Sequence, residues 1–477
     1  MKKIVVGVLI MSLLVVTGCT KKVADSGVQQ NIVPEKKEIV FYNLFDAEDA
    51  LRGQIQAYES AHKDIKITYK KFQSVEEYQK LLLNELAEGR GPDIFAIRND
   101  WMPNYWRKLT PAPASVLIPE KFAETFLGVA NDDLVRADEK GLEQVWGIPL
   151  FIDTLAIYYN KQLFRDNLPS TNKPAETWDA LKEQVFALAK QDNSIERFTV
   201  AGIAMGLAAN ISAFPDIFSL LLLQEGADLY DASGAKTVFA KNKGVSAGTG
   251  KPFFPTLEAL KLYTSFASPS ARHFSWNLPI TALYPEQKEI GAFARGKVAM
   301  IFGFSSAYSD IKVAIDGLAR ENEPTIQLEN IGISEVPQFE GAKEAGRRDA
   351  FAKYFPLVVS KNSPYSSEAW DFLQFLSSPE SLTTYNEKTQ KPTSRLDMIE
   401  EESTEKTFGA FARQAPYAKS LQTLDPDQFF AIFATLMDEV VKNNISPEQA
   451  IDQAEKQIDC VLAKRKKPEL DQNCLAL

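Results

Sequence analysis

Strand-like and helix-like segments alternate at the start of the globular part of this chain. Residues 38–43 form an apolar run typical of a buried strand, and a helical pattern follows it. Residues 65–69 alternate as a second strand, Ser74 and Glu77 have the spacing of a capping box, and residues 94–97 form a third apolar strand. Strands that alternate with helices of this length favour a parallel sheet with helices on both faces. We therefore expect an α/β fold.

The N-terminus has the pattern of an export signal. Lys2 and Lys3 precede an apolar run that ends at Gly18, directly before Cys19. This run is shorter than the roughly 20 residues that span a bilayer. The segment resembles a bacterial lipoprotein signal, which implies cleavage before Cys19 and lipid attachment to that residue. We expect a signal peptide over residues 1–18, a flexible tether over residues 19–36, and a body outside the cytoplasm, anchored at the cell surface or in the periplasm. The alternative is an ordinary signal peptide whose cysteine has no role.

Composition excludes several function classes. Without residues 1–18, the chain has 459 residues and a net charge near −12, and this length suggests two or three domains. Such an acidic chain argues against a nucleic-acid partner, because binding to phosphates needs clustered Lys and Arg. The chain contains two histidines, His62 and His273, so we expect no metal site and no cofactor. Cys460 and Cys474 could close a 15-residue loop as a disulfide, or remain two free thiols.

Several short segments, spread over nearly the whole chain, carry a family resemblance. They are Gly91-Pro92-Asp93, Trp146-Gly147-Ile148-Pro149, Tyr158-Tyr159-Asn160-Lys161, Thr177-Trp178-Asp179, Gly296-Lys297-Val298-Ala299-Met300, Ala369-Trp370-Asp371-Phe372-Leu373 and Ser446-Pro447-Glu448-Gln449-Ala450. In this order they resemble the extracellular solute-binding proteins of ABC importers, in particular the sugar binders similar to maltose-binding protein. The resemblance covers about residues 38–463.

That family implies two lobes, each with a mixed or parallel sheet flanked by helices, joined by a hinge of three chain crossovers. By analogy, the chain crosses between the lobes near Asp153, Gly303 and Val358. We expect lobe 1 to contain residues 37–153 and 304–358, and lobe 2 to contain residues 154–303 and 359–477. The ligand then lies between the lobes, beyond the strand ends, and the hinge closes around it.

The resemblance also suggests three binding residues. Asp153 lies within an apolar run, where an unpaired carboxylate is costly, and it falls at the first crossover, facing the cleft. Asp100 aligns with an acidic position that contacts sugar, and Phe430 aligns with an aromatic residue of the cleft. Asp153 could instead be a structural hinge carboxylate that caps a helix or pairs with a base, and Asp100 could be a helix N-cap.

Five further residues are candidates for ligand contacts. Trp101 and Trp276 could stack on the apolar face of a sugar ring, although a tryptophan is more often a core residue. Asn43, Ser305 and Tyr354 follow strands at positions expected to open on the cleft, although strand-end serines commonly form turns.

These features together lead to a functional expectation with three rivals. We expect a monomeric, membrane-anchored receptor that delivers a small molecule, most often a sugar in this family, to the permease subunits of an ABC importer without catalysis. A secreted glycoside hydrolase would need two carboxylates about 5–10 Å apart, a role conceivable for Asp100 and Asp153. A binder of polyamines or peptides, or a receptor coupled to a sensor kinase, could use the same clamp.

Overall fold

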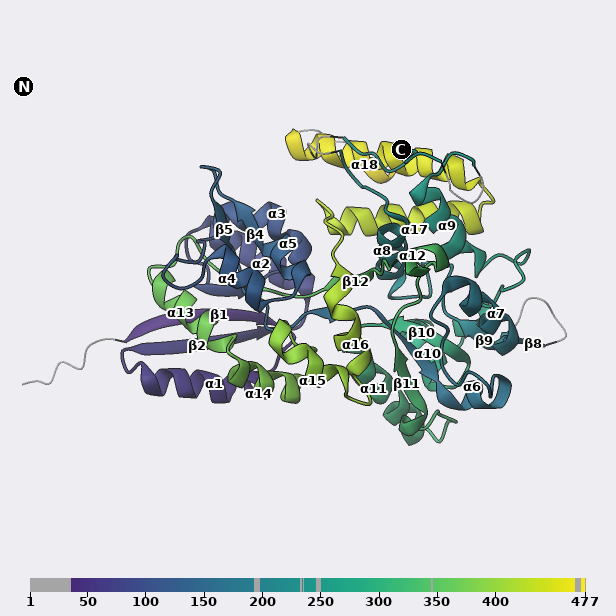
Figure 1. Cartoon of the computed structure of the whole chain (residues 1–477), viewed down its shortest axis with the longest axis horizontal. Coiled ribbons are helices and arrows are strands. Elements are labelled where there is room, and N and C mark those ends of the chain that lie inside the picture. Colours follow the sequence, from purple (N-terminus) through teal and green to yellow (C-terminus); the bar gives the residue numbers. More distant parts are fainter. Residues whose placement is uncertain are drawn as a thin grey trace, which may run out of the picture.

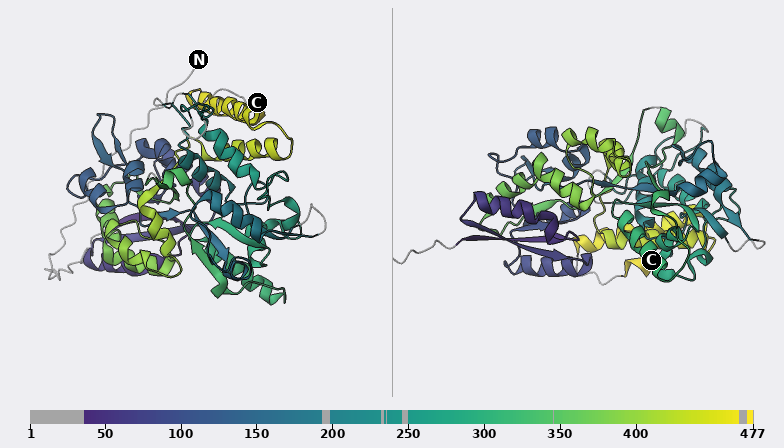
Figure 2. Two further views of the ribbon diagram at one scale, coloured as in Figure 1. Left: turned by 45° about the vertical axis from the view of Figure 1, so that its right-hand side comes forward. Right: turned by 90° about the horizontal axis from the view of Figure 1, so that it is seen from below.

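The computed structural model describes residues 36–192, 198–231, 234, 236–245, 250–344, 346–467 and 473–476. The expected signal peptide, Cys19 and the tether up to residue 35 lie outside the described residues. Two lobes lie side by side and are joined by short strands between them (Figure 1). Two further views show the same division into lobes (Figure 2). The α/β fold with two lobes is confirmed.

Lobe 1 is built on a four-stranded sheet with the order β13-β3-β1-β2. The strands are β1 (Lys37–Leu44), β2 (Ile65–Phe72), β3 (Ile94–Ala96) and β13 (Leu357–Val359). β1 is parallel to β2 and β3, as expected, whereas β13 is antiparallel to β3. The helices of this lobe are α1 (Glu48–Ala61), α2 (Val75–Ala87), α3 (Met102–Tyr105), α4 (Pro119–Thr125), α5 (Gly128–Leu134), α13 (Ser366–Leu376) and α14 (Pro379–Thr389). Ser74 caps α2 by accepting a hydrogen bond from the Glu77 N–H, as its spacing predicts.

Lobe 2 is built on a five-stranded mixed sheet with the order β11-β7-β10-β9-β8. The strands are β7 (Ala156–Asn160), β8 (Lys190–Gln191), β9 (Phe198–Ile203), β10 (Val298–Gly303) and β11 (Ile331–Ser334). Its helices are α6 (Lys161–Asn167), α7 (Trp178–Leu188), α8 (Phe214–Glu225), α9 (Pro255–Ser265), α10 (Lys288–Ala294), α11 (Ala307–Arg320), α12 (Glu340–Glu344), α17 (Pro426–Val441) and α18 (Pro447–Lys466). The predicted start of α18 is confirmed, because the Ser446 side chain accepts a hydrogen bond from the Gln449 N–H.

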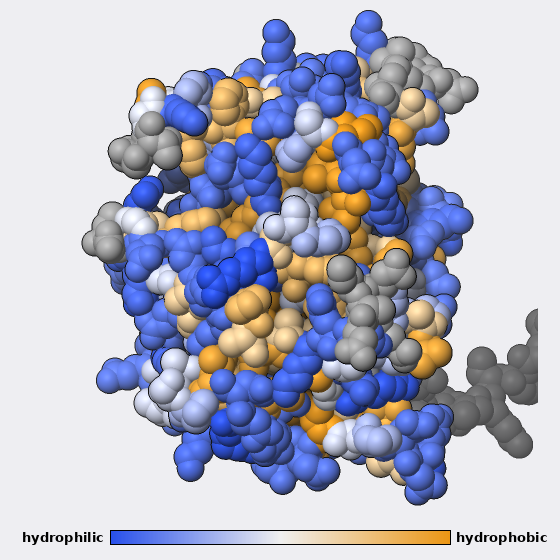
Figure 3. Space-filling model, turned by 90° about the vertical axis from the view of Figure 1, so that its right-hand side faces the viewer, coloured by the Kyte–Doolittle hydropathy of each residue, from blue (hydrophilic) through white to orange (hydrophobic). Residues whose placement is uncertain are grey.

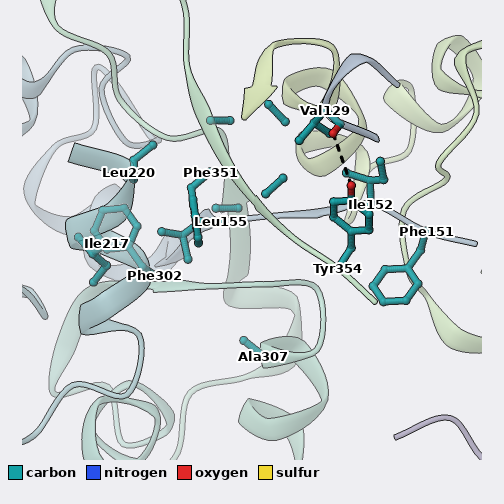
Figure 4. Packing of buried hydrophobic residues seen from close by; sticks show 14 of the residues in the cluster. Val129, Phe151, Ile152, Leu155, Ile217, Leu220, Phe302, Ala307, Phe351 and Tyr354 are labelled. Atoms are coloured by element: carbon teal, nitrogen blue, oxygen red, sulfur yellow. Dashed lines mark hydrogen bonds between the residues drawn. The ribbon is translucent and has the colours of Figure 1, made fainter. Parts of the chain in front are cut away.

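The hinge contains a small sheet of its own. Its strands are β6 (Asp153–Thr154), β12 (Ala350–Lys353) and β14 (Ala418–Lys419), in the order β14-β12-β6. Figure 4 shows Phe351 of β12 lying toward Ile217 and Leu220 of α8 in lobe 2. Beyond β12, the hydroxyl oxygen of Tyr354 lies 3.5 Å from the carbonyl oxygen of Val129 in α5 of lobe 1. The hinge therefore joins the apolar cores of both lobes.

The expected lobe boundaries need two corrections. Residues 304–358 were expected in lobe 1, but β11 pairs with β7, and α11 packs on α10, so both elements belong to lobe 2. Residues 359–477 were expected in lobe 2, but α13 and α14 both pack on α1 of lobe 1. The chain does not cross near Gly303. It crosses at β6, at β12 and again after β14. The lobe of each strand is set by the strands with which it pairs, and these partners can be distant in the sequence.

The remaining elements complete the two lobes. They are the β4–β5 hairpin (Val135–Ala137 and Glu143–Val145), α15 (Ile399–Ser403) and α16 (Gly409–Gln414). Cys460 of α18 and Cys474 form a disulfide bond, so of the two alternatives the structure supports the paired one.

On the end of lobe 2 that Figure 3 shows, hydrophilic side chains alternate with small hydrophobic patches. Within the described ranges, no helix is both long enough and apolar enough to cross a membrane.

Candidate functional site

A small pocket lies where both lobes and the hinge meet. Lobe 1 contributes Asn99 and Asp100, the hinge contributes Lys353, and lobe 2 contributes Ser219 and Phe430. Phe351, Ala352, Leu421 and Thr423 complete the lining. The pocket has a volume of only about 10 Å³, which leaves room for about one water molecule. The lobes are therefore closed against each other at this point. We call this site the Asp100 pocket.

Backbone hydrogen bonds fix the lobe 1 side of the pocket. After β3 ends at Ala96, the chain forms a 3-10 turn over residues 99–101. The N–H of Asn99 donates to the carbonyl of Tyr354 (3.0 Å), and the N–H of Tyr354 donates to Oδ1 of Asn99 (3.3 Å). These two bonds attach the turn that carries Asp100 to the end of β12. The strand end of lobe 1 and the hinge thus form one continuous wall.

Two ion pairs, one buried and one partly buried, balance the charges of this region. Nε of Arg98 donates to Oδ1 of Asp100 at 2.6 Å, and Nζ of Lys353 lies 2.5 Å from Oδ1 of Asp216 in α8. Burial raises the pKa of the Asp100 carboxyl, and the Arg98 charge opposes that rise. Each cation has a carboxylate of its own, so the region carries no unbalanced charge among these four groups.

Phe430 provides an aromatic ring between the two cations. The guanidinium of Arg98 lies 5.6 Å from the ring centroid, and Nζ of Lys353 lies 5.8 Å from it. Both distances are within the range of cation–π contacts. Arg98 comes from lobe 1 and Phe430 from α17 of lobe 2, so this contact forms across the cleft.

One hydrogen-bond donor of the site is left without an acceptor. Nη2 of Arg98 is buried and has no partner among the described residues. The hydroxyl of Thr423 reaches Oδ2 of Asp100 only at 3.4 Å. Arg98 itself does not line the pocket, and its unsatisfied buried donor is costly to the protein.

Asp153 of the hinge strand β6 and Ser305, which follows β10 of lobe 2, bind each other and do not line the Asp100 pocket. The Asp153 carboxylate accepts the Ser305 hydroxyl at 2.6 Å and the Ser305 N–H at 3.0 Å, just before α11 begins. Burial raises the Asp153 pKa to about 6, although the bonds from Ser305 oppose the rise. In this arrangement Asp153 has the geometry of the structural alternative, a hinge carboxylate beside a helix start.

The side chains of Asn43, Trp101 and Tyr354 are buried against the protein itself. The Asn43 amide donates to Asp46 at 3.4 Å, and the Trp101 ring stacks on Tyr105 with centroids 5.8 Å apart. The Tyr354 hydroxyl donates to Oδ2 of the buried Asp133 at 2.8 Å. The expectation that Tyr354 opens on the cleft is corrected, because its side chain is fully buried.

Trp276 requires the largest correction. Its ring is 0% exposed in the core of lobe 2, and its Nε1–H donates to Oδ1 of Asn210 at 2.9 Å. A ring packed on all sides presents no face to a ligand. Trp276 is therefore a core residue in this structure, and the predicted stacking role does not hold.

The sequence interpretation missed Arg98, Lys353 and Asp216. Arg98 precedes Asp100 by two residues in the segment that follows β3, so its position could have drawn attention. Lys353 and Asp216 are 137 residues apart, and no local pattern connects them. Of the candidates, the structure brings Asp100 and Phe430 together and places the others around them or away from them.

A comparison with protein families identifies the chain's relatives. The sequence profile described as bacterial extracellular solute-binding protein matches residues 46–382. A protein of Brucella abortus (strain 2308), named as a binding protein, is 21% identical over 392 residues, which are 80% of this chain and 82% of that protein.

Solved structures share the fold at low sequence identity. The sugar-binding protein MalE from Xanthomonas citri has a TM-score of 0.69 and 17% identity, covering 92% of this chain and 100% of that one. A solute-binding protein of an ABC transporter from Thermotoga lettingae, solved with α-D-tagatose, has a TM-score of 0.62 and 19% identity, covering 90% of this chain and 100% of that one.

Proposed function

The chain belongs to the bacterial extracellular solute-binding proteins, and we propose that it is a carbohydrate receptor that delivers its ligand to an ABC importer. Asp100 and Phe430, together with Arg98, Thr423 and Lys353, would form the binding site. Asn43, Trp101, Asp153 and Ser305 would act from the surrounding shell, by holding the strand ends and the hinge in place.

The observation that carries this proposal is the arrangement around Phe430. Its ring offers an apolar face, and the hydroxyl of Thr423 and the carboxylate of Asp100 line the same pocket as hydrogen-bonding groups. Sugars combine an apolar ring face with hydroxyl groups that both donate and accept. A flat aromatic surface with a few convergent polar groups is suited to such a ligand.

Charge balance favours a neutral sugar over the charged rivals. Asp100 is paired with Arg98 and Asp216 with Lys353, so a polyamine or other cation would have to displace a cation that is already paired. Burying a charge without a partner is costly. The same balance disfavours an anion. A neutral polyhydroxyl ligand can exchange hydrogen bonds with both pairs without separating them.

The hydrolase alternative lacks a matching pair of acids. Asp100 lines the pocket, but Asp153 does not and is bound by Ser305 in the hinge. The family and the solved relatives named above are binding proteins. We propose that this chain likewise binds without turnover. A role in presenting the ligand to a sensor kinase would use the same clamp.

Opening of the hinge would admit the ligand. In this structure the pocket is closed, with contacts across the cleft between Arg98 and Phe430 and between Asp100 and Thr423. A bound sugar would lie between these residues, and each of them would then contact the sugar instead of its present partner. The closed form would then present a distinct surface to the permease subunits.

Anchoring and oligomeric state are further parts of the proposal. The motif at Cys19 supports a lipid anchor outside the cytoplasm, on the cell surface or in the periplasm. The three chain crossovers support hinge motion within one chain, so we propose a monomer.

A thermal-shift panel tests the ligand class. Neutral mono- and oligosaccharides, polyamines and amino acids would each be added to the mature protein produced without the lipid. A sugar at 100 times its Kd should stabilise the protein by about 2.7 kcal/mol. Stabilisation by polyamines or amino acids alone would contradict the proposal, and so would conversion of any sugar into a product.

A further inference from the structure

Asp133 is a buried carboxylate just outside the lining of the Asp100 pocket. It lies in the last turn of α5 in lobe 1 and is 7% exposed. Figure 4 shows the hydroxyl of Tyr354 directed toward Val129, which lies one helical turn before Asp133. A buried carboxylate is costly unless hydrogen bonds satisfy it, so its hydrogen-bond partners indicate its role.

Four neutral side chains donate hydrogen bonds to the Asp133 carboxylate. Oδ2 accepts the amide of Asn99 at 2.9 Å and the hydroxyl of Tyr354 at 2.8 Å. Oδ1 accepts the amide of Gln422 at 2.6 Å and also the hydroxyl of Ser420. Burial raises the pKa of Asp133, and these four bonds oppose the rise because they stabilise the ionised form. The carboxylate thus binds three segments of the chain that are distant from one another in the sequence.

The first two segments carry the lobe 1 wall and the hinge wall of the Asp100 pocket. Asn99 lines the pocket and directly precedes Asp100, while Tyr354 directly follows Lys353, which also lines it. The Asn99 side chain uses both ends of its amide, because Oδ1 accepts the N–H of Tyr354 at 3.3 Å while Nδ2 donates to Asp133. Asp133 therefore fixes which way this amide faces, and with it the turn that carries Asp100.

The third segment links β14 to α17 and carries another wall of the pocket. The side chains of Ser420 and Gln422 donate to Asp133. Leu421 and Thr423, which alternate with them in the sequence, line the pocket. An extended chain places neighbouring side chains on opposite sides. The hydrogen bonds to Asp133 on one side of this segment therefore set the position of Thr423 on the other.

We propose that Asp133 is a positioning residue of the ligand site, which holds these three walls at the spacing that ligand binding requires. The inference rests on the proposed function, because it concerns affinity for the ligand of the Asp100 pocket. Asp133 does not itself line the pocket. Its effect passes through Thr423 and Asp100, whose hydroxyl and carboxylate oxygens lie 3.4 Å apart. A carboxylate that only stabilised lobe 1 would change the free energy of unfolding and leave ligand affinity unchanged.

Asp133→Asn tests the proposal with the smallest change in shape. An amide offers one acceptor oxygen where the carboxylate offers two, so one pair of donors would face an NH₂ group. Asp93→Asn is the matched control, because Asp93 is another buried carboxylate of lobe 1. It accepts the N–H of Val40 and the hydroxyl of Ser363, and neither partner lines the pocket.

Hydrogen exchange of the ligand-free mature protein tests the positioning directly. The N–H groups of Asn99 and Leu424 are hydrogen-bonded and lie in two of the segments that Asp133 connects. In Asp133→Asn both should exchange about fivefold faster or more, a larger change than that of amides in β1 and β2 of the same lobe. Asp93→Asn should leave both at the wild-type rate. Unchanged exchange at these two amides in Asp133→Asn would overturn the proposal.

Titration calorimetry with the panel sugar that gives the largest thermal shift tests the effect on binding. Affinity should fall about fivefold or more in Asp133→Asn and stay at the wild-type value in Asp93→Asn. Thr423→Val should weaken binding too, and its combination with Asp133→Asn should lose less affinity than the product of the two single losses. Wild-type affinity in Asp133→Asn, or losses that multiply in the double variant, would overturn the proposal.

Two points keep the test decisive. If Asp133→Asn does not fold, Ser420→Ala removes one donor and leaves the carboxylate in place; it should speed exchange at Leu424 and weaken sugar binding, and no change in either would overturn the proposal. If no sugar of the panel binds, the proposed function fails, and hydrogen exchange still decides whether Asp133 holds the pocket walls. The two proposals can therefore fail separately.

Discussion

Replacing Trp276 should lower stability strongly without removing a ligand contact. The ring is fully buried, and truncation of such a residue to alanine costs about 3–5 kcal/mol through lost burial and the cavity left behind. Trp276→Phe keeps most of the ring but removes the indole N–H. Oδ1 of Asn210 then loses its donor, which should cost about 1–3 kcal/mol. The predicted order of stability is therefore wild type, Trp276→Phe, Trp276→Ala.

Urea unfolding of the mature protein measures these differences, with ligand affinity measured on the same samples. Leu283→Ala is the matched control, because this side chain is 88% exposed and its truncation should change stability by less than about 0.5 kcal/mol. Trp276→Phe should bind ligand with wild-type affinity. The reasoning is refuted if Trp276→Ala unfolds within about 1 kcal/mol of the wild type, or if Trp276→Phe folds normally but loses ligand binding.

Three further predictions concern the hinge and the two ends of the chain. The folded-state pKa of Asp153, about 6, lies above the ordinary value of 3.8, so protonation of this carboxyl favours folding. The free energy of unfolding should therefore fall by about 3 kcal/mol in total as the pH rises from about 4 to about 6. Unfolding titrations at several pH values should show this component in the wild type and not in Asp153→Asn, and equal pH slopes would argue against it. Replacing Cys460 and Cys474 by alanine should cost about 3 kcal/mol in non-reducing buffer, and dithiothreitol should lower the stability of the wild type alone. Cys19→Ser should release the protein from membranes, whereas a variant that stays bound after a salt wash would remove the lipid anchor from the account.

Local patterns predicted the elements of the fold well. The strand and helix sequence of lobe 1 follows from apolar periodicity, and the caps at Ser74 and Ser446 are where the sequence predicts them. Such features depend on residues within a few positions of each other, so a single sequence contains the necessary information.

Lobe membership depended on contacts that local patterns do not encode. β11 reads as an ordinary short strand, and only its pairing with β7, about 170 residues earlier, places it in lobe 2. α13 was expected as a helix, but its assignment to lobe 1 comes from packing on α1 and β13. The expected crossover at Gly303 was wrong for this reason.

The candidate site likewise combines residues that the sequence predicts with residues that depend on distant contacts. The family resemblance led to Asp100 and Phe430, which the structure brings into one pocket. It also led to Trp276. The indole of Trp276 is held in the core by its hydrogen bond to Asn210, which is 66 residues away in the sequence. The role of Arg98 depends on a ring from the other lobe, and such a contact across the cleft has no signature in the sequence around it.

The central claim is that a neutral solute binds between the lobes at Phe430. Titration calorimetry with the best sugar of the thermal-shift panel tests it most directly, using the wild type, Phe430→Ala and the exposed control Phe186→Ala on α7. We predict one site per chain, little dependence on salt, and at least a tenfold loss of affinity in Phe430→Ala only, the effect expected for an aromatic anchor worth about 1.4 kcal/mol or more. Equal affinity in all three proteins would contradict the claim and place the ligand elsewhere.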